Sequence, residues 1–167
     1  MTRWVRLLVV GTAALVVAAM SATAIEAQAA SSVEVNIKLV ELLKAPPYTF
    51  PTCPDIGENV NCGSGEFRPF GQASEIVSIN ACGDNCTIRW ITVRGGTIVL
   101  REALSDPSCP GVCVTQWPHG APFSGTLTAD VVYGTGIFAG ATGSLTGTLT
   151  AAAFEAQITY SGMVALG

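Results

Sequence analysis

Residues 125–147, GTLTADVVYGTGIFAGATGSLTG, constrain the fold of this chain more than any other stretch. Two Thr-rich segments, residues 125–133 and 144–151, alternate apolar and polar side chains, which is typical of half-buried β-strands. The segment between them is dense in glycine, which adopts positive φ and allows backbones to approach closely. We therefore predict a β-hairpin with a long, specific glycine turn.

The same turn matches the loose dinucleotide-binding pattern G-x-G-x-x-A over residues 134–139. That pattern binds a pyrophosphate only when a helix follows, because the helix N-terminus holds the phosphates. Here residues 141–150, ATGSLTGTLT, follow, and their glycines and β-branched residues oppose helix formation. The turn is thus predicted to be structural, and we expect no nucleotide cofactor.

The N-terminus has the three parts of a secretory signal peptide. Basic residues precede an uncharged apolar run over residues 7–20, and small residues end in the A-x-A sequence at 27–29. We expect cleavage after Ala29, with Ala24 as the second choice. Residues 1–29 would then be removed, and residues 30–167 would be secreted as one extracellular domain.

An uncleaved membrane anchor is the alternative interpretation of this N-terminus. Residues 7–25 carry no charge and are just long enough to cross a bilayer. After cleavage, the sequence predicts no stable membrane span.

The net charge limits the partners of the mature chain. The whole chain has a net charge of −4, and removal of Arg3, Arg6 and Glu26 with the signal peptide makes the net charge about −5. Nucleic acids and anionic membrane surfaces both require clustered Lys and Arg. We therefore expect neither as a partner, and the sequence does not indicate an oligomeric state.

The cysteines form three close pairs, and an even count in an exported chain predicts disulfides. A hairpin brings the residues beside its turn within disulfide reach, and each pair flanks a short loop. The predicted bonds are Cys53–Cys62, Cys82–Cys86 and Cys109–Cys113. The alternative is a zinc site that pools the last four cysteines, but metal thiolates favour C-x2-C spacing and a reducing compartment.

Alternating or β-rich segments elsewhere predict further strands, and no helix is expected beyond the signal peptide. Residues 45–65 and 106–122 are predicted loops because they are rich in proline or poor in apolar residues. The predicted strands are residues 33–43, 74–81, 87–94, 97–104, 124–133, 144–151 and 157–166, with an eighth at 66–70. Hairpin-linked strands in this number predict an all-β, up-and-down antiparallel closed barrel, with an open sandwich as the alternative.

The glycine turn resembles that of the allene oxide cyclase and dirigent superfamily, and is most similar to small exported bacterial members of it. Residues 65–71 (GEFRPFG), the Cys82/Cys86 turn and residues 121–128 (APFSGTLT) also resemble that group. The resemblance implies an eight-stranded antiparallel barrel with an apolar interior. The plant cyclases cyclise a fatty-acid epoxide, dirigent proteins direct phenoxy-radical coupling, and many members have no known activity.

Catalytic motifs are few. The chain has one histidine, His119, in a loop of proline and glycine, where a solvated side chain is the simpler interpretation. Glu34 and Asn36 resemble a Glu-x-Asn of the plant cyclases, but alternation turns both away from the apolar face. No metal-binding motif or cofactor fingerprint is found, so we predict neither a metal nor a cofactor.

Three charged residues share a strand face with apolar ones, namely Glu75, Arg89 and Glu102. If those faces point into the barrel, the charges lie in a dry lumen, where they must be paired. A buried acid there would have a raised pKa and could act as an acid. The alternative is that all three lie at the rim or face solvent.

The remaining predicted lumen residues follow from alternation along the last three strands. They are Leu127, Val131, Tyr133, Leu145, Gly147, Leu149, Ile158 and Tyr160. Glycines on these faces leave room, so the lumen is predicted to bind a small apolar molecule without catalysis. The two tyrosines could instead fill a packed core. The alternative function is a cyclase or isomerase without metal or cofactor, which confines a reactive apolar substrate.

Overall fold

The computed structural model describes residues 31–42, 60–83, 86–105, 120–153 and 155–167. The described residues form eight β-strands and one turn of 3₁₀-helix, and the predicted signal peptide lies outside them. In chain order the elements are β1 (Ser31–Leu42), β2 (Val60–Arg68), β3 (Gly71–Ser78), β4 (Cys86–Val93), β5 (Gly96–Ser105), β6 (Gly120–Gly134), η1 (Gly136–Phe138), β7 (Thr142–Ala153) and β8 (Glu155–Leu166).

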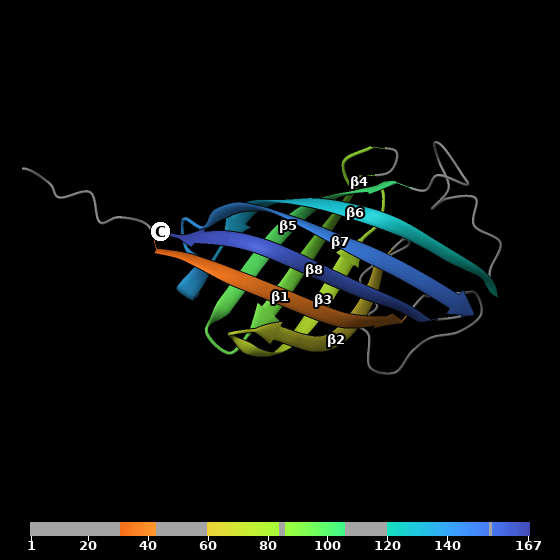
Figure 1. The fold of residues 1–167 in the computed structure, drawn as a ribbon, viewed down its shortest axis with the longest axis horizontal. Coiled ribbons are helices and arrows are strands. Elements are labelled where there is room, and N and C mark those ends of the chain that lie inside the picture. Colours follow the sequence, from red (N-terminus) through yellow and green to blue (C-terminus); the bar gives the residue numbers. More distant parts are fainter. Residues whose placement is uncertain (1–30, 43–59, 84–85, 106–119, 154) are drawn as a thin grey trace, which may run out of the picture.

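The eight strands form a closed, up-and-down antiparallel barrel (Figure 1). Each strand pairs with the next in the sequence, and β8 closes the barrel on β1 over a register that runs from Ser31↔Leu166 to Leu42↔Glu155. Closure leaves no exposed sheet edge. The predicted fold class is confirmed, and the sandwich alternative is wrong.

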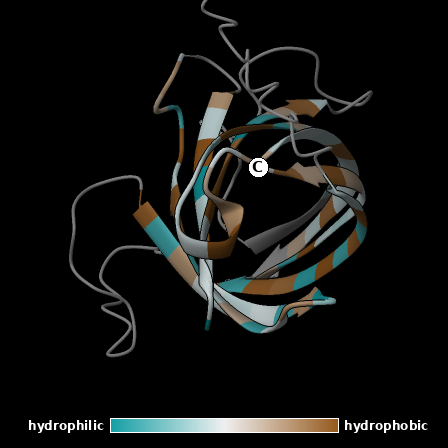
Figure 2. Ribbon diagram, turned by 90° about the vertical axis from the view of Figure 1, so that its left-hand side faces the viewer, coloured by the Kyte–Doolittle hydropathy of each residue, from teal (hydrophilic) through white to brown (hydrophobic). Residues whose placement is uncertain are grey.

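Alternation along the strands separates a buried interior from a polar exterior. On β1, Val35, Ile37 and Leu39 are buried while Glu34 and Asn36 are exposed. Figure 2 shows the same pattern as brown and teal bands that alternate along the strands. Glu34 and Asn36 therefore face away from the lumen, as alternation predicts.

The glycine turn closes one end of the interior with an aromatic cluster. Phe138, in η1, is completely buried. Its ring stacks on Phe67 with centroids 5.5 Å apart and meets Phe70 edge-on at 4.8 Å. A Cβ at Gly134 would collide with the backbone carbonyl oxygen of Phe138, and Gly136 has a φ of +60°. The glycines therefore allow the chain to pass close to the ring that they enclose.

Strand β2 is longer than the sequence predicts. Residues 60–65 were expected to be a loop, because Asn, Cys, Gly and Ser give no apolar alternation. All of them pair with β3, and residues 62–65 pair with β1 as well. Backbone pairing, rather than side-chain pattern, forms this half of the strand. A Cβ at Gly65 would collide with the carbonyl oxygen of Lys38, so the close approach of β1 requires glycine here.

Candidate functional site

The barrel interior contains a cluster of charged side chains from four different strands. Each is at most 3% exposed, and alternation along its strand places it on the inward face. The cluster consists of Glu41 on β1, Glu75 on β3, Arg89 on β4 and Glu102 on β5. We refer to these four residues as the ionic cluster. Glu75, Arg89 and Glu102 are therefore buried in the lumen and paired. The alternative, that they lie at the rim or face solvent, is wrong.

Arg89 joins all three carboxylates. Its Nε donates to Glu102 Oε1 at 2.6 Å, and its Nη1 donates to Glu41 Oε2 at 3.1 Å. Nη1 also donates to Glu75 Oε2. Asn61 adds a further donor, with Nδ2 2.6 Å from Glu41 Oε1. The planar guanidinium, with several N–H donors at fixed angles, suits this role because one side chain can serve carboxylates from several directions.

The cluster has more acid than base. Three carboxyl groups face one guanidinium, and every other buried side chain that the structure describes is uncharged. Burial raises the pKa of Glu75 to about 7, against the attraction of Arg89, and Glu41 and Glu102 raise it further. Burial also acts to lower the pKa of Arg89, but the carboxylates, Glu102 first, hold it well above its usual value. Near neutral pH, Glu75 can therefore exchange a proton.

Two polar atoms beside this cluster make no hydrogen bond of good geometry among the described residues. They are Glu75 Oε1 and the hydroxyl of Tyr160, whose residues are 2% and 1% exposed. Burial raises the pKa of Tyr160 well above its usual value, so its hydroxyl keeps its proton. Arg89, Glu102 and Glu75 all act electrostatically on this hydroxyl, which also donates weakly to the Glu102 carboxylate and therefore lies next to the cluster. Because a buried polar group without a partner is costly, the two atoms mark a point where a ligand could bond.

The local sequence of β2 makes room for the cluster. Gly63 pairs with both Glu41 on β1 and Glu75 on β3. A Cβ at Gly63 would collide with Glu75 Oε1. The glycine therefore leaves the space that the unpaired carboxylate oxygen occupies.

Most of the predicted lumen residues do face the interior. Leu127, Leu145, Ile158 and Tyr160 are buried, at 1–2% exposure, while Val131 and Leu149 are half-buried and pack against the core. These residues surround the cluster with apolar surface. They give the interior the amphipathic character that a mainly apolar ligand with one polar group would need.

Tyr133 was predicted to face the lumen and does not. Its side chain is 62% exposed on the outer surface. Tyr133 pairs with Val99 but Val131 pairs with Leu100, so Val132 is an extra residue on β6. This β-bulge shifts the alternation by one residue and turns both Val132 and Tyr133 outward.

Gly147 was predicted to leave room in the lumen, and this interpretation is also wrong. A Cβ at this position would collide with the carbonyl oxygen of Thr159 on the neighbouring strand β8 and lie 2.9 Å from Tyr160 Cδ1. The glycine thus permits the close approach of β7 and β8. A leucine here would disrupt the strand pair rather than fill a cavity.

Two members of the site were missed by the sequence interpretation. Glu41 continues the inward alternation of Val35, Ile37 and Leu39 by one more step, so extending that pattern would have found it. Asn61 lies in the part of β2 that resembles a loop, and no sequence signal distinguishes it.

The disulfide predictions are confirmed in part. Cys82 and Cys86 are bonded, with Cα atoms 5.2 Å apart, which excludes these two as thiolate ligands of zinc. Cys62 is also disulfide-bonded. Its predicted partner Cys53 lies outside the described residues, as do Cys109, Cys113 and His119.

No family model matches the chain, and neither the curated proteins nor the solved structures include a significant match. The resemblance to allene oxide cyclase-like barrels therefore stays a prediction. Within the described residues, no helix has the length and apolar character to cross a membrane. These residues also contain no group of three or more His, Cys, Asp or Glu side chains suited to a metal ion.

Proposed function

We propose that this protein binds a small, mainly apolar molecule in its lumen, with the polar end of the ligand at the ionic cluster. The observation that carries the proposal is the buried carboxylate oxygen Glu75 Oε1, which has no partner among the described residues and lies in the same cluster as the weakly bonded Tyr160 hydroxyl. Native proteins seldom leave such an atom unpaired unless a ligand, water, ion or catalytic role accounts for it. The apolar walls would supply most of the binding energy.

The excess of carboxyl groups in the ionic cluster determines which polar group of a ligand can bind there. With three carboxyl groups and one guanidinium, the cluster favours a ligand group that donates hydrogen bonds or carries positive charge. A carboxylate would be repelled by Glu75 once that residue ionises. We therefore expect a long-chain amine or alcohol to bind more tightly than a fatty acid of equal length.

The test is native mass spectrometry of protein purified from its own host, followed by titration with an environment-sensitive apolar dye. A bound small molecule, or saturable micromolar dye binding displaced by dodecylamine, supports the proposal. A protein without bound ligand and without saturable dye binding contradicts it.

A cyclase or isomerase is the second candidate, and one observation favours it. A Glu75 with a pKa of about 7 can donate or accept a proton at neutral pH, as a general acid or base must. Confinement in the lumen would orient the substrate. Incubation of the recovered ligand with the protein should then give an isomer of unchanged mass, and Glu75→Gln should slow its formation at least about a hundredfold.

We also propose that the protein is secreted and belongs with the exported allene oxide cyclase-like barrels. The Cys82–Cys86 disulfide supports an oxidising compartment. Mass spectrometry of the protein from culture medium should find an N-terminus at Ala30. Retention in the membrane fraction with an intact N-terminus would favour the anchor alternative.

A further inference from the structure

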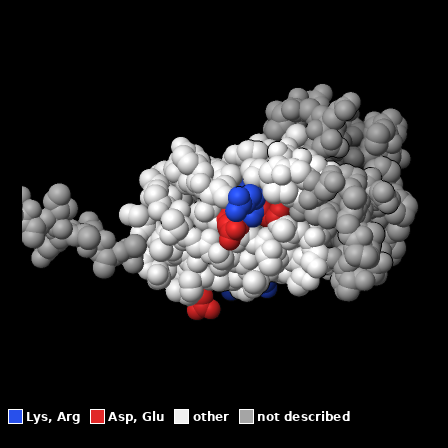
Figure 3. All heavy atoms as spheres, turned by 90° about the horizontal axis from the view of Figure 1, so that it is seen from above, with Lys and Arg blue, Asp and Glu red and all other residues white. Residues whose placement is uncertain are grey.

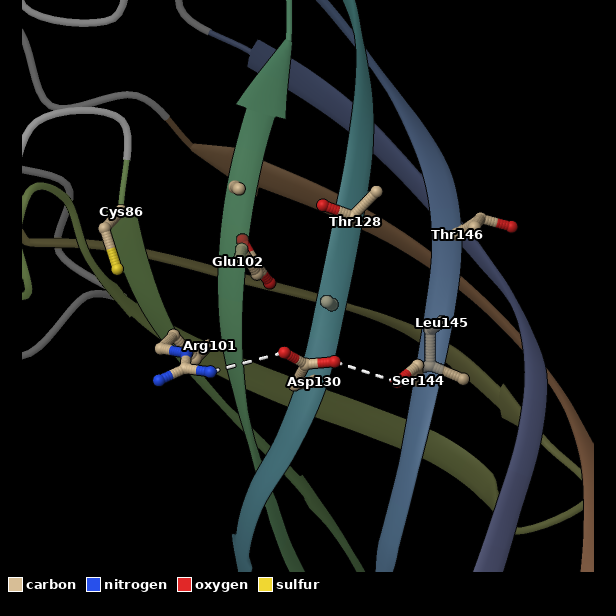
Figure 4. A pocket seen from close by; sticks show the side chains of 10 residues that line it. Cys86, Arg101, Glu102, Thr128, Asp130, Ser144, Leu145 and Thr146 are labelled. Carbon is tan, nitrogen blue, oxygen red and sulfur yellow. Dashed lines mark hydrogen bonds and ion pairs between the residues drawn. The ribbon is translucent and has the colours of Figure 1, made fainter.

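A depression in the barrel wall combines outward-facing charged and hydroxyl side chains with the buried residues Glu102, Ala129 and Leu145. It has a volume of about 330 Å³ and lies over β5, β6 and β7 (Figure 4). The side chains that give it hydrogen-bonding capacity are Arg101, Thr128, Asp130, Ser144 and Thr146. Its volume is at the lower end of the range for small-molecule sites, which is roughly 300–1,000 Å³.

The polar groups of the depression are connected. Arg101 Nη2 donates to Asp130 Oδ2 at 3.3 Å, and Ser144 Oγ donates to Asp130 Oδ1 at 2.8 Å. These bonds, that of Ser144 first, hold the pKa of Asp130 below its usual value, so it stays ionised. Figure 3 shows a small group of basic and acidic side chains in the middle of a largely uncharged surface. The Arg101–Asp130 pair is locally neutral, so the depression does not select for a charged ligand.

An exposed aromatic surface lies one step along the strands from this pair. Val99 on β5 pairs with Trp90 on β4 and with Tyr133 on β6. It lies two residues before Arg101, which pairs with Asp130. Trp90 is 37% exposed and Tyr133 is 62% exposed, whereas the outward-facing Val99 between them is only 6% exposed. The three side chains thus form a continuous apolar surface beside the depression. The bulge at Val132 is what brings Tyr133 onto it.

We propose that the depression and the Trp90–Tyr133 surface together bind a neutral oligosaccharide. A sugar ring has an apolar C–H face, which packs on the electron-rich face of an aromatic ring. Its hydroxyls both donate and accept, so they match a mixed set of guanidinium, carboxylate and hydroxyl partners. A protein partner would need a larger surface with an apolar centre, whereas the depression has a volume of about 330 Å³ and places its charged and hydroxyl groups among Ala103, Ala129 and Leu145.

The experiment is isothermal titration of the disulfide-intact protein with cello-, chito-, malto-, manno- and xylo-hexaose. We expect saturable binding of at least one hexaose with a Kd of about 0.1–1 mM. Trp90→Ala should weaken it about tenfold, as loss of a Trp anchor does. Asp130→Asn should weaken it several-fold.

Matched controls separate this site from a general surface effect and from the lumen. Glu66→Gln disrupts another exposed ion pair, Glu66–Arg68, and Met163→Ala removes an exposed apolar side chain away from the site. Neither variant, nor Tyr160→Phe in the lumen, should change hexaose binding. Absence of saturable binding by all five hexaoses at 10 mM, or equal binding by wild type and Trp90→Ala, would overturn the proposal. Stable capture of a protein in place of a glycan would overturn it as well.

Discussion

The barrel interior holds two clusters of opposite chemistry. The aromatic cluster of Phe67, Phe70 and Phe138 is composed of apolar rings in stacked and edge-on contact. The ionic cluster around Arg89 contains three acids, one base and an unpartnered carboxylate oxygen. Packing alone explains the aromatic cluster. It does not explain the ionic cluster, because apolar side chains of similar size would often stabilise the fold as well as buried ions do. The difference indicates that the ionic cluster has a role besides stability.

Removal of the central base should have the largest effect. Arg89→Met leaves three buried carboxyl groups without their shared donor, so we expect a loss of at least about 4 kcal/mol in the free energy of unfolding at pH 8. The loss should shrink at pH 4, because Glu75, whose pKa is about 7, is then protonated and no longer needs a counter-charge. Urea melts at both pH values test this, with the exposed Arg94→Met as control. A loss under about 1 kcal/mol at pH 8 would mean that water reaches the cluster.

Truncation of a ring in the aromatic cluster should lower the free energy of unfolding slightly less than Arg89→Met does. The loss should not depend on pH. Phe138→Ala removes a completely buried ring, so we expect a loss of about 3 kcal/mol through the cavity that remains. The neighbouring exposed Ile137→Ala is the matched control and should cost under about 1 kcal/mol. Equal losses for the two variants in urea melts would show that the ring does not close the barrel.

A pH titration should separate the two clusters further. The folded pKa of Glu75, about 7, lies above its unfolded value near 4.5, so the folded state binds the extra proton between these values. The titration of Glu75 therefore lowers the free energy of unfolding as pH rises from about 4.5 to 7, by up to about 3 kcal/mol.

Glu75→Gln removes this titration without removing the volume of the side chain. The free energy of unfolding of the variant, measured relative to wild type, should therefore rise between pH 5 and pH 8. A relative stability that stays constant or falls over this range would contradict the raised pKa. The Phe138→Ala variant serves as control, because its difference from wild type should stay constant with pH.

Both clusters could be predicted from the sequence only in part. The glycine turn that carries Phe138 was predicted, but the contacts of its ring with Phe67 and Phe70 depend on how the strands pack. Glu75, Arg89 and Glu102 were placed on inward faces by alternation, but their pairing depends on the barrel register. That register brings Arg89 to Glu41, 48 residues away in the chain.

The errors have one physical origin, which is backbone geometry that side-chain pattern does not report. The bulge at Val132 turns Tyr133 outward, and the close approach of β8 requires Gly147. In β2, backbone pairing forms a strand where the sequence has no alternation, so Asn61 was missed. Each of these features depends on how the backbone fits against a neighbouring strand, which the side-chain pattern of one strand does not report.

The most direct test of luminal binding compares two Tyr→Phe variants that differ only in location. Tyr160→Phe removes the buried luminal hydroxyl, and Tyr133→Phe removes an exposed one. Both should change the free energy of unfolding by at most about 1 kcal/mol, because the Tyr160 hydroxyl loses only a weak interaction with Glu102 and the Tyr133 hydroxyl is exposed. In a dodecylamine competition titration against the apolar dye, we expect Tyr160→Phe to weaken amine binding about tenfold and Tyr133→Phe to leave it unchanged. Equal amine affinity in both variants and wild type would contradict a ligand site at the ionic cluster.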